Sequence, residues 1–155
     1  MNKDLEILPI KPLNVNEKIS YHPHLPSIIK NRGFILNIIG STASGKTTLI
    51  NNLLLNKNFW GGKKNAFDAV YIFSPSIYMD DSCRFLKEHF TCYTSYQDDD
   101  LQAILTSQES FEVADMPKIC IVIDDSVGMI NRNSKLNHFL SRYRHWNANV
   151  IMSVQ

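Results

Sequence analysis

Eight consecutive residues of this 155-residue chain, Gly40–Thr47, match the complete phosphate-binding pattern G-x-x-x-x-G-K-[ST]. The apolar run 34–39 precedes them, and the helix-compatible stretch 48–55 follows. A strand, a glycine-rich turn and a helix in this order direct backbone N–H groups and the positive end of a helix dipole at one anion. The segment therefore predicts a strand–loop–helix unit that binds a nucleoside triphosphate.

The side chains of this loop have expected roles. Lys46 is placed to reach the β- and γ-phosphates, and the Thr47 hydroxyl is placed to bind Mg²⁺. The residues that we expect to contact the nucleotide are Gly40, Ser41, Thr42, Ala43, Ser44, Gly45, Lys46, Thr47 and Thr48.

The rest of the chain alternates apolar strands with helices. Further strands are expected at 69–73, 119–123 and 150–154, and helices at 80–90, from 98 onward and at 136–143. The strand 119–123 has no polar residue, which is typical of a parallel sheet covered on both faces. This order predicts a doubly wound, mainly parallel α/β sheet of the P-loop NTPase type, in its RecA-like (ASCE) form. Residues 1–32 hold four prolines and are expected to form an extended lead-in, with a short strand at 5–8, to a core at 33–155.

Two acids, Asp124 and Asp125, follow the strand 119–123. Carboxyl ends of such strands face the ligand crevice, so we expect Asp124 to hold Mg²⁺ through a water and Asp125 to orient and partly deprotonate the attacking water. The alternative is that these acids only begin a loop or cap a helix. Residues 125–128 also spell D-x-x-G, but the guanine-reading Asn-Lys-x-Asp is missing, because Phe59 stands where it needs Asp. ATP with Mg²⁺ is therefore favoured over GTP.

Composition narrows the class of protein. Hydrophobic residues make up 44% and charged residues 20%, as in a soluble globular domain. With a net charge of +1, contact with nucleic acid would need locally clustered basic groups or those of other subunits. The three cysteines lack C-x-x-C spacing, which favours reduced thiols. Since neither a signal segment nor an apolar run near 18 residues is visible, we expect no membrane-spanning segment and no secretion.

Four features narrow the family: residues 24–26 (His-Leu-Pro), the loop 40–48, the acid pair after 121–123, and Arg144-His145 before a strand that ends at Gln155. Together, over about residues 22–155, they resemble the FtsK–HerA superfamily of P-loop motors. The resemblance is strongest to the genome-packaging ATPases of large DNA viruses and virophages, the poxvirus type included. It implies that Gln155 senses the γ-phosphate or the attacking water. It also implies that Arg144, with Arg142 in reserve, is an arginine finger for the neighbouring subunit's nucleotide.

By this resemblance the chain is an ATP-hydrolysing motor that translocates double-stranded DNA into a viral capsid. It implies a homo-oligomeric ring, capsid or portal-vertex partners, and a location in the host cytoplasm, a viral factory or the virion. Two alternatives stay open: a non-hydrolysing ATP-dependent scaffold in virion assembly, and a P-loop nucleotide or small-molecule kinase. Superfamily members have a further core strand beside the first one. We therefore expect the sheet to be truncated after its fourth core strand, the strand 34–39 to be an exposed edge, and the chain to be part of a longer reading frame.

Overall fold

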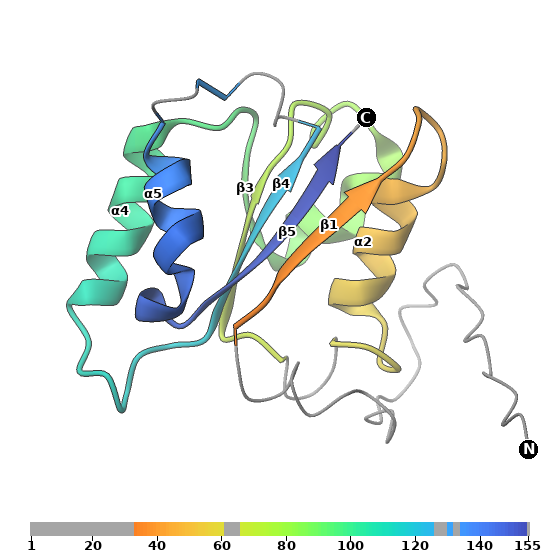
Figure 1. Cartoon of the computed structure of the whole chain (residues 1–155). Coiled ribbons are helices and arrows are strands. Elements are labelled where there is room, and N and C mark those ends of the chain that lie inside the picture. Colours follow the sequence, from red (N-terminus) through yellow and green to blue (C-terminus); the bar gives the residue numbers. More distant parts are fainter. Residues whose placement is uncertain (1–32, 61–65, 126–129, 132–133, 155) are drawn as a thin grey trace, which may run out of the picture.

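The computed structural model describes residues 33–60, 66–125, 130–131 and 134–154 (Figure 1). Strands and helices alternate along them, as expected. In chain order the strands and α-helices are β1 (Ile35–Ile39), α2 (Lys46–Leu55), β2 (Ala69–Phe73), α3 (Arg84–His89), β3 (Thr91–Tyr93), α4 (Asp98–Glu109), β4 (Ile119–Asp124), α5 (Lys135–Arg142) and β5 (Ala148–Val154).

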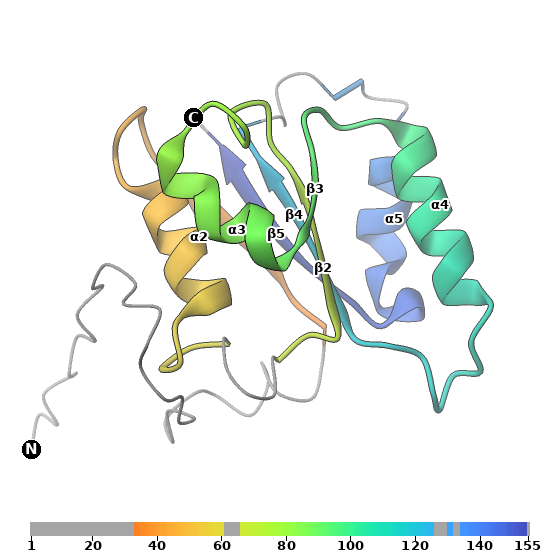
Figure 2. The same cartoon turned by 180° about the vertical axis from the view of Figure 1, so that it is seen from behind.

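The strands form one parallel sheet with the order β1-β5-β4-β2-β3. Helices α2 and α3 cover one face, and α4 and α5 cover the other, as Figures 1 and 2 show from opposite sides. The prediction of a parallel α/β sheet with helices on both faces is confirmed. The carboxyl ends of the strands therefore share one edge of the sheet, which we call the carboxyl edge.

Strand β4 lies at the centre, and all six of its residues are buried. Its side chains alternate between two hydrophobic clusters. Cys120 and Val122 pack on the α2 face, while Ile119, Ile121 and Ile123 pack on the α4–α5 face. Each isoleucine removed from water in this way stabilises the fold by about 2 kcal/mol. Burial on both faces explains why this strand shows no polar alternation.

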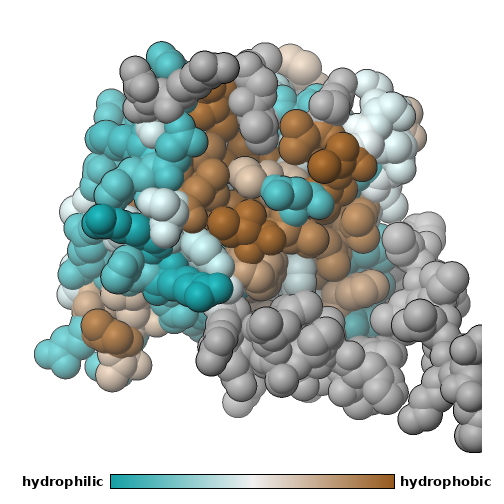
Figure 3. Space-filling view, in the orientation of Figure 1, coloured by the Kyte–Doolittle hydropathy of each residue, from teal (hydrophilic) through white to brown (hydrophobic). Residues whose placement is uncertain are grey.

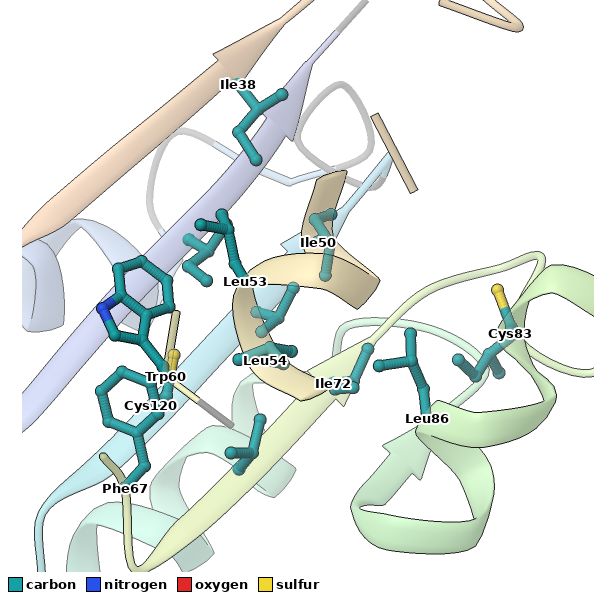
Figure 4. Close-up of a cluster of buried hydrophobic side chains, with 14 residues drawn as sticks. Ile38, Ile50, Leu53, Leu54, Trp60, Phe67, Ile72, Cys83, Leu86 and Cys120 are labelled. Carbon is teal, nitrogen blue, oxygen red and sulfur yellow. The ribbon is translucent and has the colours of Figure 1, made fainter. Parts of the chain in front are cut away.

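The cluster on the α2 face fixes the position of helix α2. Ile50, Leu53 and Leu54 of the helix pack against the sheet, next to the indole of Trp60 (Figure 4). The Trp60 ring stacks on Phe34, with 5.0 Å between centroids, and meets Phe67 edge-on at 5.6 Å. These contacts hold α2 against the sheet with its first residue, Lys46, at the carboxyl edge.

Strand β1 forms one edge of the sheet, with no strand beyond it among the described residues. Phe34 O accepts a bond from Val150 N of β5, so the outward-facing backbone groups belong to residues 35, 37 and 39. Ile35 is 38% exposed and Ile39 is 80% exposed. Figure 3 shows hydrophobic side chains gathered on the surface where β1 lies. The expected apolar edge is therefore confirmed.

Several boundaries differ from the sequence prediction. Strand β3 was not predicted, and the predicted helix 80–90 is a 3₁₀ turn, Asp81–Cys83, followed by the short α3. Helix α5 ends at Arg142, where a second 3₁₀ turn, Tyr143–Trp146, leads into β5 two residues earlier than predicted. The lead-in 1–32 and its short strand lie outside the described residues.

Strand β3 has only three residues, which is too short to show a period. Tertiary contacts hold it instead. Ser74 N donates to Tyr93 O at 3.0 Å, and the Tyr93 ring stacks on Phe73 at 4.7 Å.

Candidate nucleotide-binding site

The glycine-rich loop lies at the carboxyl edge of the sheet, between β1 and α2 (Figure 1). Gly40 N donates to Val154 O at 3.2 Å, which ties the start of the loop to the end of β5. The loop residues 41–45 are exposed, while Lys46 and Thr47 are half-buried. The loop therefore offers its backbone to solvent and to a ligand.

The loop is tightly curled. Ala43 and Gly45 have left-handed backbones, with φ of 60° and 90°, and Ser44 N donates to Ser41 O at 3.2 Å. A Cβ at Gly40 would lie 2.5 Å from the Ser44 hydroxyl oxygen, so a larger residue would displace that side chain. Consecutive N–H groups in turns with left-handed residues converge on anions. The conformation thus fits a phosphate group.

The Lys46 ammonium donates hydrogen bonds to the backbone of its own loop. Nζ donates to Gly40 O at 2.8 Å and to Ser41 O at 3.0 Å. The first turn of α2 has no acidic residue, so the positive end of its dipole is not neutralised from within the helix. An anion bound here would meet both the lysine charge and the helix dipole.

The two acids lie in different surroundings although they are adjacent. Asp124 ends β4 and is 6% exposed, and its Oδ2 accepts a bond from Ser74 Oγ at 3.1 Å. Asp125 is exposed and has a left-handed backbone with φ of 52°, and its N–H donates to Ser153 O at 3.3 Å. The left-handed residue turns the chain out of the strand, so that one carboxylate is enclosed and its neighbour faces solvent.

Strand alternation places Asp124 on the same face as Val122, which is the face covered by α2. Thr47 lies in the first turn of that helix. A threonine hydroxyl and a carboxylate are hard oxygen ligands, and Mg²⁺ is commonly held by one or two carboxylates together with substrate phosphates. These two side chains thus suit a magnesium–nucleotide complex.

A protein-family comparison matches residues 26–155 to the model of the poxvirus A32 protein. The chain belongs to the poxvirus A32 protein family. No curated protein and no solved structure matches it. The match covers 130 of 155 residues (155 − 26 + 1) and includes both the loop and the acid pair. It confirms the resemblance to poxvirus-type packaging ATPases of the FtsK–HerA kind, and it implies an ATPase role in viral genome packaging.

Arg144 of this A32-family chain lies far from the loop. It belongs to the 3₁₀ turn before β5, at the amino edge of the sheet, and its Nε donates to the Tyr143 hydroxyl oxygen at 3.1 Å. Tyr143 in turn donates to Gly33 O at 3.1 Å. The seven residues of β5 separate the two edges by about 20 Å at ~3.3 Å per residue. Arg142, which is exposed at the end of α5, lies at the same amino edge. Neither arginine can reach the loop of its own chain.

Gln155 and residues 24–26 lie outside the described residues. The helices among the described residues are all too short or too polar to cross a bilayer.

Two serines near Asp124 were missed by the sequence prediction. Ser74 directly follows β2, and Ser153 lies opposite Asp124 on β5. The only signal in the sequence is a polar residue at the end of an otherwise apolar strand. That signal does not show which strand ends become neighbours.

The ionisable groups with shifted pKa values belong to the core and to its edges. Burial raises the pKa of Cys92 on β3 to about 11, and burial also raises the pKa of Cys120 on β4. Burial, and then a hydrogen bond to Asp98, raise the pKa of Tyr96. All three cysteines are free thiols.

Proposed function

We propose that this chain is an ATP-hydrolysing motor that drives double-stranded DNA into a viral capsid. One observation carries the proposal beyond family membership. The curled loop with Lys46 and the pair Asp124–Asp125 lie at the same carboxyl edge of the sheet, at the ends of β1 and β4. A triphosphate seated on the loop would have a carboxylate available for its metal ion and another for the attacking water.

The roles follow from these surroundings. Residues 40–48 bind the phosphates. When they do, Lys46 exchanges its hydrogen bonds to Gly40 O and Ser41 O for bonds to the β- and γ-phosphates. Mg²⁺, held by Thr47 and Asp124, would neutralise phosphate charge when bound. The exposed Asp125 accepts a proton from the water that attacks the γ-phosphate, giving ADP and phosphate. Gln155 is assigned to sense the γ-phosphate.

The position of Arg144 favours a ring. An arginine at the amino edge can serve only a nucleotide on another subunit, and the reserve residue Arg142 has the same constraint. The contact joins the amino edge of one sheet to the carboxyl edge of the next. It is therefore heterologous, and it closes as a ring or continues as a filament. A ring that encloses DNA needs the closed form.

The DNA contact is expected to be electrostatic and independent of sequence, because a packaging motor must move along any sequence. With a net charge of +1 per chain, the positive charge must be concentrated in the pore of the ring. Activity should then fall steeply as salt is raised. We assign capsid or portal-vertex proteins as further partners, and the host cytoplasm, a viral factory or the virion as the location.

The test is Mg²⁺-ATP turnover by the purified protein with and without linear double-stranded DNA, compared with Asp125→Asn. Turnover that DNA stimulates and the substitution abolishes supports the motor. Tight ATP binding without turnover, unchanged by the substitution, would instead support a nucleotide-dependent scaffold. Phosphoryl transfer to an added nucleoside would identify a kinase.

The ring has its own test, a mixture of Asp125→Asn and Arg144→Ala proteins. Each is expected to be inactive alone. In a mixed ring, an Arg144→Ala subunit can receive the arginine finger of an Asp125→Asn neighbour. When equal amounts of the two proteins are mixed, roughly a quarter of the sites should therefore regain activity. No recovery would contradict a finger supplied by the neighbouring subunit.

A further inference from the structure

Three polar side chains form a row across the carboxyl edge of the sheet, on the face covered by α2. Asp124 of β4 lies opposite Ser153 of β5, and Ser153 lies opposite Ile38 of β1. Phe73 lies opposite Ile123, so the next residue, Ser74, lies beside Asp124 on its other side. Ile38, Val122 and Ile151 belong to the cluster on the α2 face, and strand alternation puts the three polar side chains on that same face.

On one side of the carboxylate, the hydrogen bonds have a defined direction. Ser74 Oγ lies 3.1 Å from Asp124 Oδ2 and 3.2 Å from Ser76 Oγ. Ser74 donates its single proton to Asp124, so Ser76 is the donor to Ser74. This bond fixes the rotation of the carboxyl group on the side that faces Ser74.

On the other side, the Ser153 hydroxyl is fully buried, with 0% of the residue exposed. Among the described residues it has no hydrogen-bond partner. Burying a hydroxyl without a partner costs free energy, and native structures rarely accept that cost outside functional sites or ordered water. Ser153 lies between the metal-binding carboxylate and the strand that leads into the phosphate loop.

We propose that Ser153 is a positioning residue for the hydrated Mg²⁺ of the nucleotide complex. Its hydroxyl bonds a water of the ion's shell, while Ser74 holds the Asp124 carboxyl group in the orientation that receives the same shell. Mg²⁺ keeps several of its waters when it binds with a nucleotide, so a buried hydroxyl beside its carboxylate has a partner only in the loaded state. This inference rests on the proposed function, since it assigns a residue to the same site.

The test measures how strongly Mg²⁺ promotes nucleotide binding. The dissociation constant of fluorescently labelled ADP is measured in EDTA and in Mg²⁺, and the ratio of the two values is the readout. We expect Ser153→Ala to lower this ratio about 3- to 10-fold, which corresponds to one hydrogen bond, with little change in the EDTA value. Ser74→Ala should lower the ratio in the same way. Ser153→Cys keeps a weak donor on a slightly larger side chain, and its ratio should fall between those of wild type and Ser153→Ala.

A matched control is Ser134→Ala. Ser134 is also a buried serine, but it precedes α5, whose Leu136 packs on the opposite face of the sheet. The control should leave the ratio unchanged, and a ratio is insensitive to partial loss of folded protein. A wild-type ratio in Ser153→Ala would overturn this inference and leave the hydroxyl to a structural water. Failure of the wild-type protein to bind nucleotide at all would instead overturn the proposed function.

Discussion

Substitutions of Asp125 can separate its chemical role from its backbone role. Its φ of 52° lies in the left-handed region, and its side chain is exposed. Left-handed backbone costs an ordinary L-residue about 1–2 kcal/mol, and Asn and Asp tolerate it best because their short polar side chains bond locally. Asp125→Asn therefore removes the carboxylate without the backbone cost, and Asp125→Ala removes the carboxylate and adds that cost.

We expect the two substitutions to have equal effects on turnover and different effects on thermal stability. Both variants should lose about 10²- to 10⁴-fold in turnover, since each lacks the proposed general base, while their ATP affinity stays near wild type. The Asn variant should melt within about 1 °C of wild type. The Ala variant should be less stable by about 1 kcal/mol, which for a chain of 155 residues lowers Tm by about 2–4 °C.

The assays are phosphate release under saturating Mg²⁺-ATP and thermal unfolding without nucleotide. Wild-type turnover in the Asn variant would refute the assignment of Asp125 as the base. Equal Tm values for the Asn and Ala variants would refute the strain argument, even if turnover falls as expected.

Three further predictions concern the loop, the sheet edge and the buried thiols. Lys46→Ala should weaken ATP binding at least about 10-fold by titration calorimetry, because the phosphates lose a charge-assisted donor. Lys57→Ala, just beyond the far end of α2, should bind ATP normally. Ile39→Glu should reduce self-association in static light scattering with little change in Tm, since Ile39 is 80% exposed on the edge strand. Val113→Glu, at a residue 90% exposed outside the sheet, is its control, and equal effects of the two would count against the edge. The urea midpoint should fall as pH rises from about 9 to about 11, because the folded state keeps Cys92 protonated to a higher pH than the unfolded chain does. Cys92→Ser should make that decline shallower without removing it, because burial also raises the pKa of Cys120. A midpoint independent of pH in the wild-type protein would contradict the prediction.

The sequence alone was sufficient wherever the signal is local. The loop 40–47 and the acids 124–125 were predicted at the ends of strands, and the structure places them at the ends of β1 and β4. Four of the five strands were also predicted, because each is a largely apolar run long enough to stand out. Adjacent residues and short periods carry this information without any knowledge of the fold.

The edge position of β1 was expected for a different reason. No property of residues 35–39 shows where that strand lies in the sheet, and an interior strand would look the same. The expectation came from the resemblance to a family, and the order of the strands in the described part of the chain confirms it.

Relations between distant segments were decided only by the tertiary structure. Ser74 and Ser153 stand on either side of Asp124 because β2, β4 and β5 are neighbours in the sheet, although the two serines are 79 positions apart (153 − 74). Arg144 lies just before β5, at the amino end of that strand. Because β5 runs from there to the carboxyl edge, Arg144 is at the edge of the sheet opposite the loop. A linear pattern specifies which residues form a strand. Which strands become neighbours depends on how the two faces of the sheet are buried by helices from the whole chain. That arrangement decided which polar groups surround Asp124.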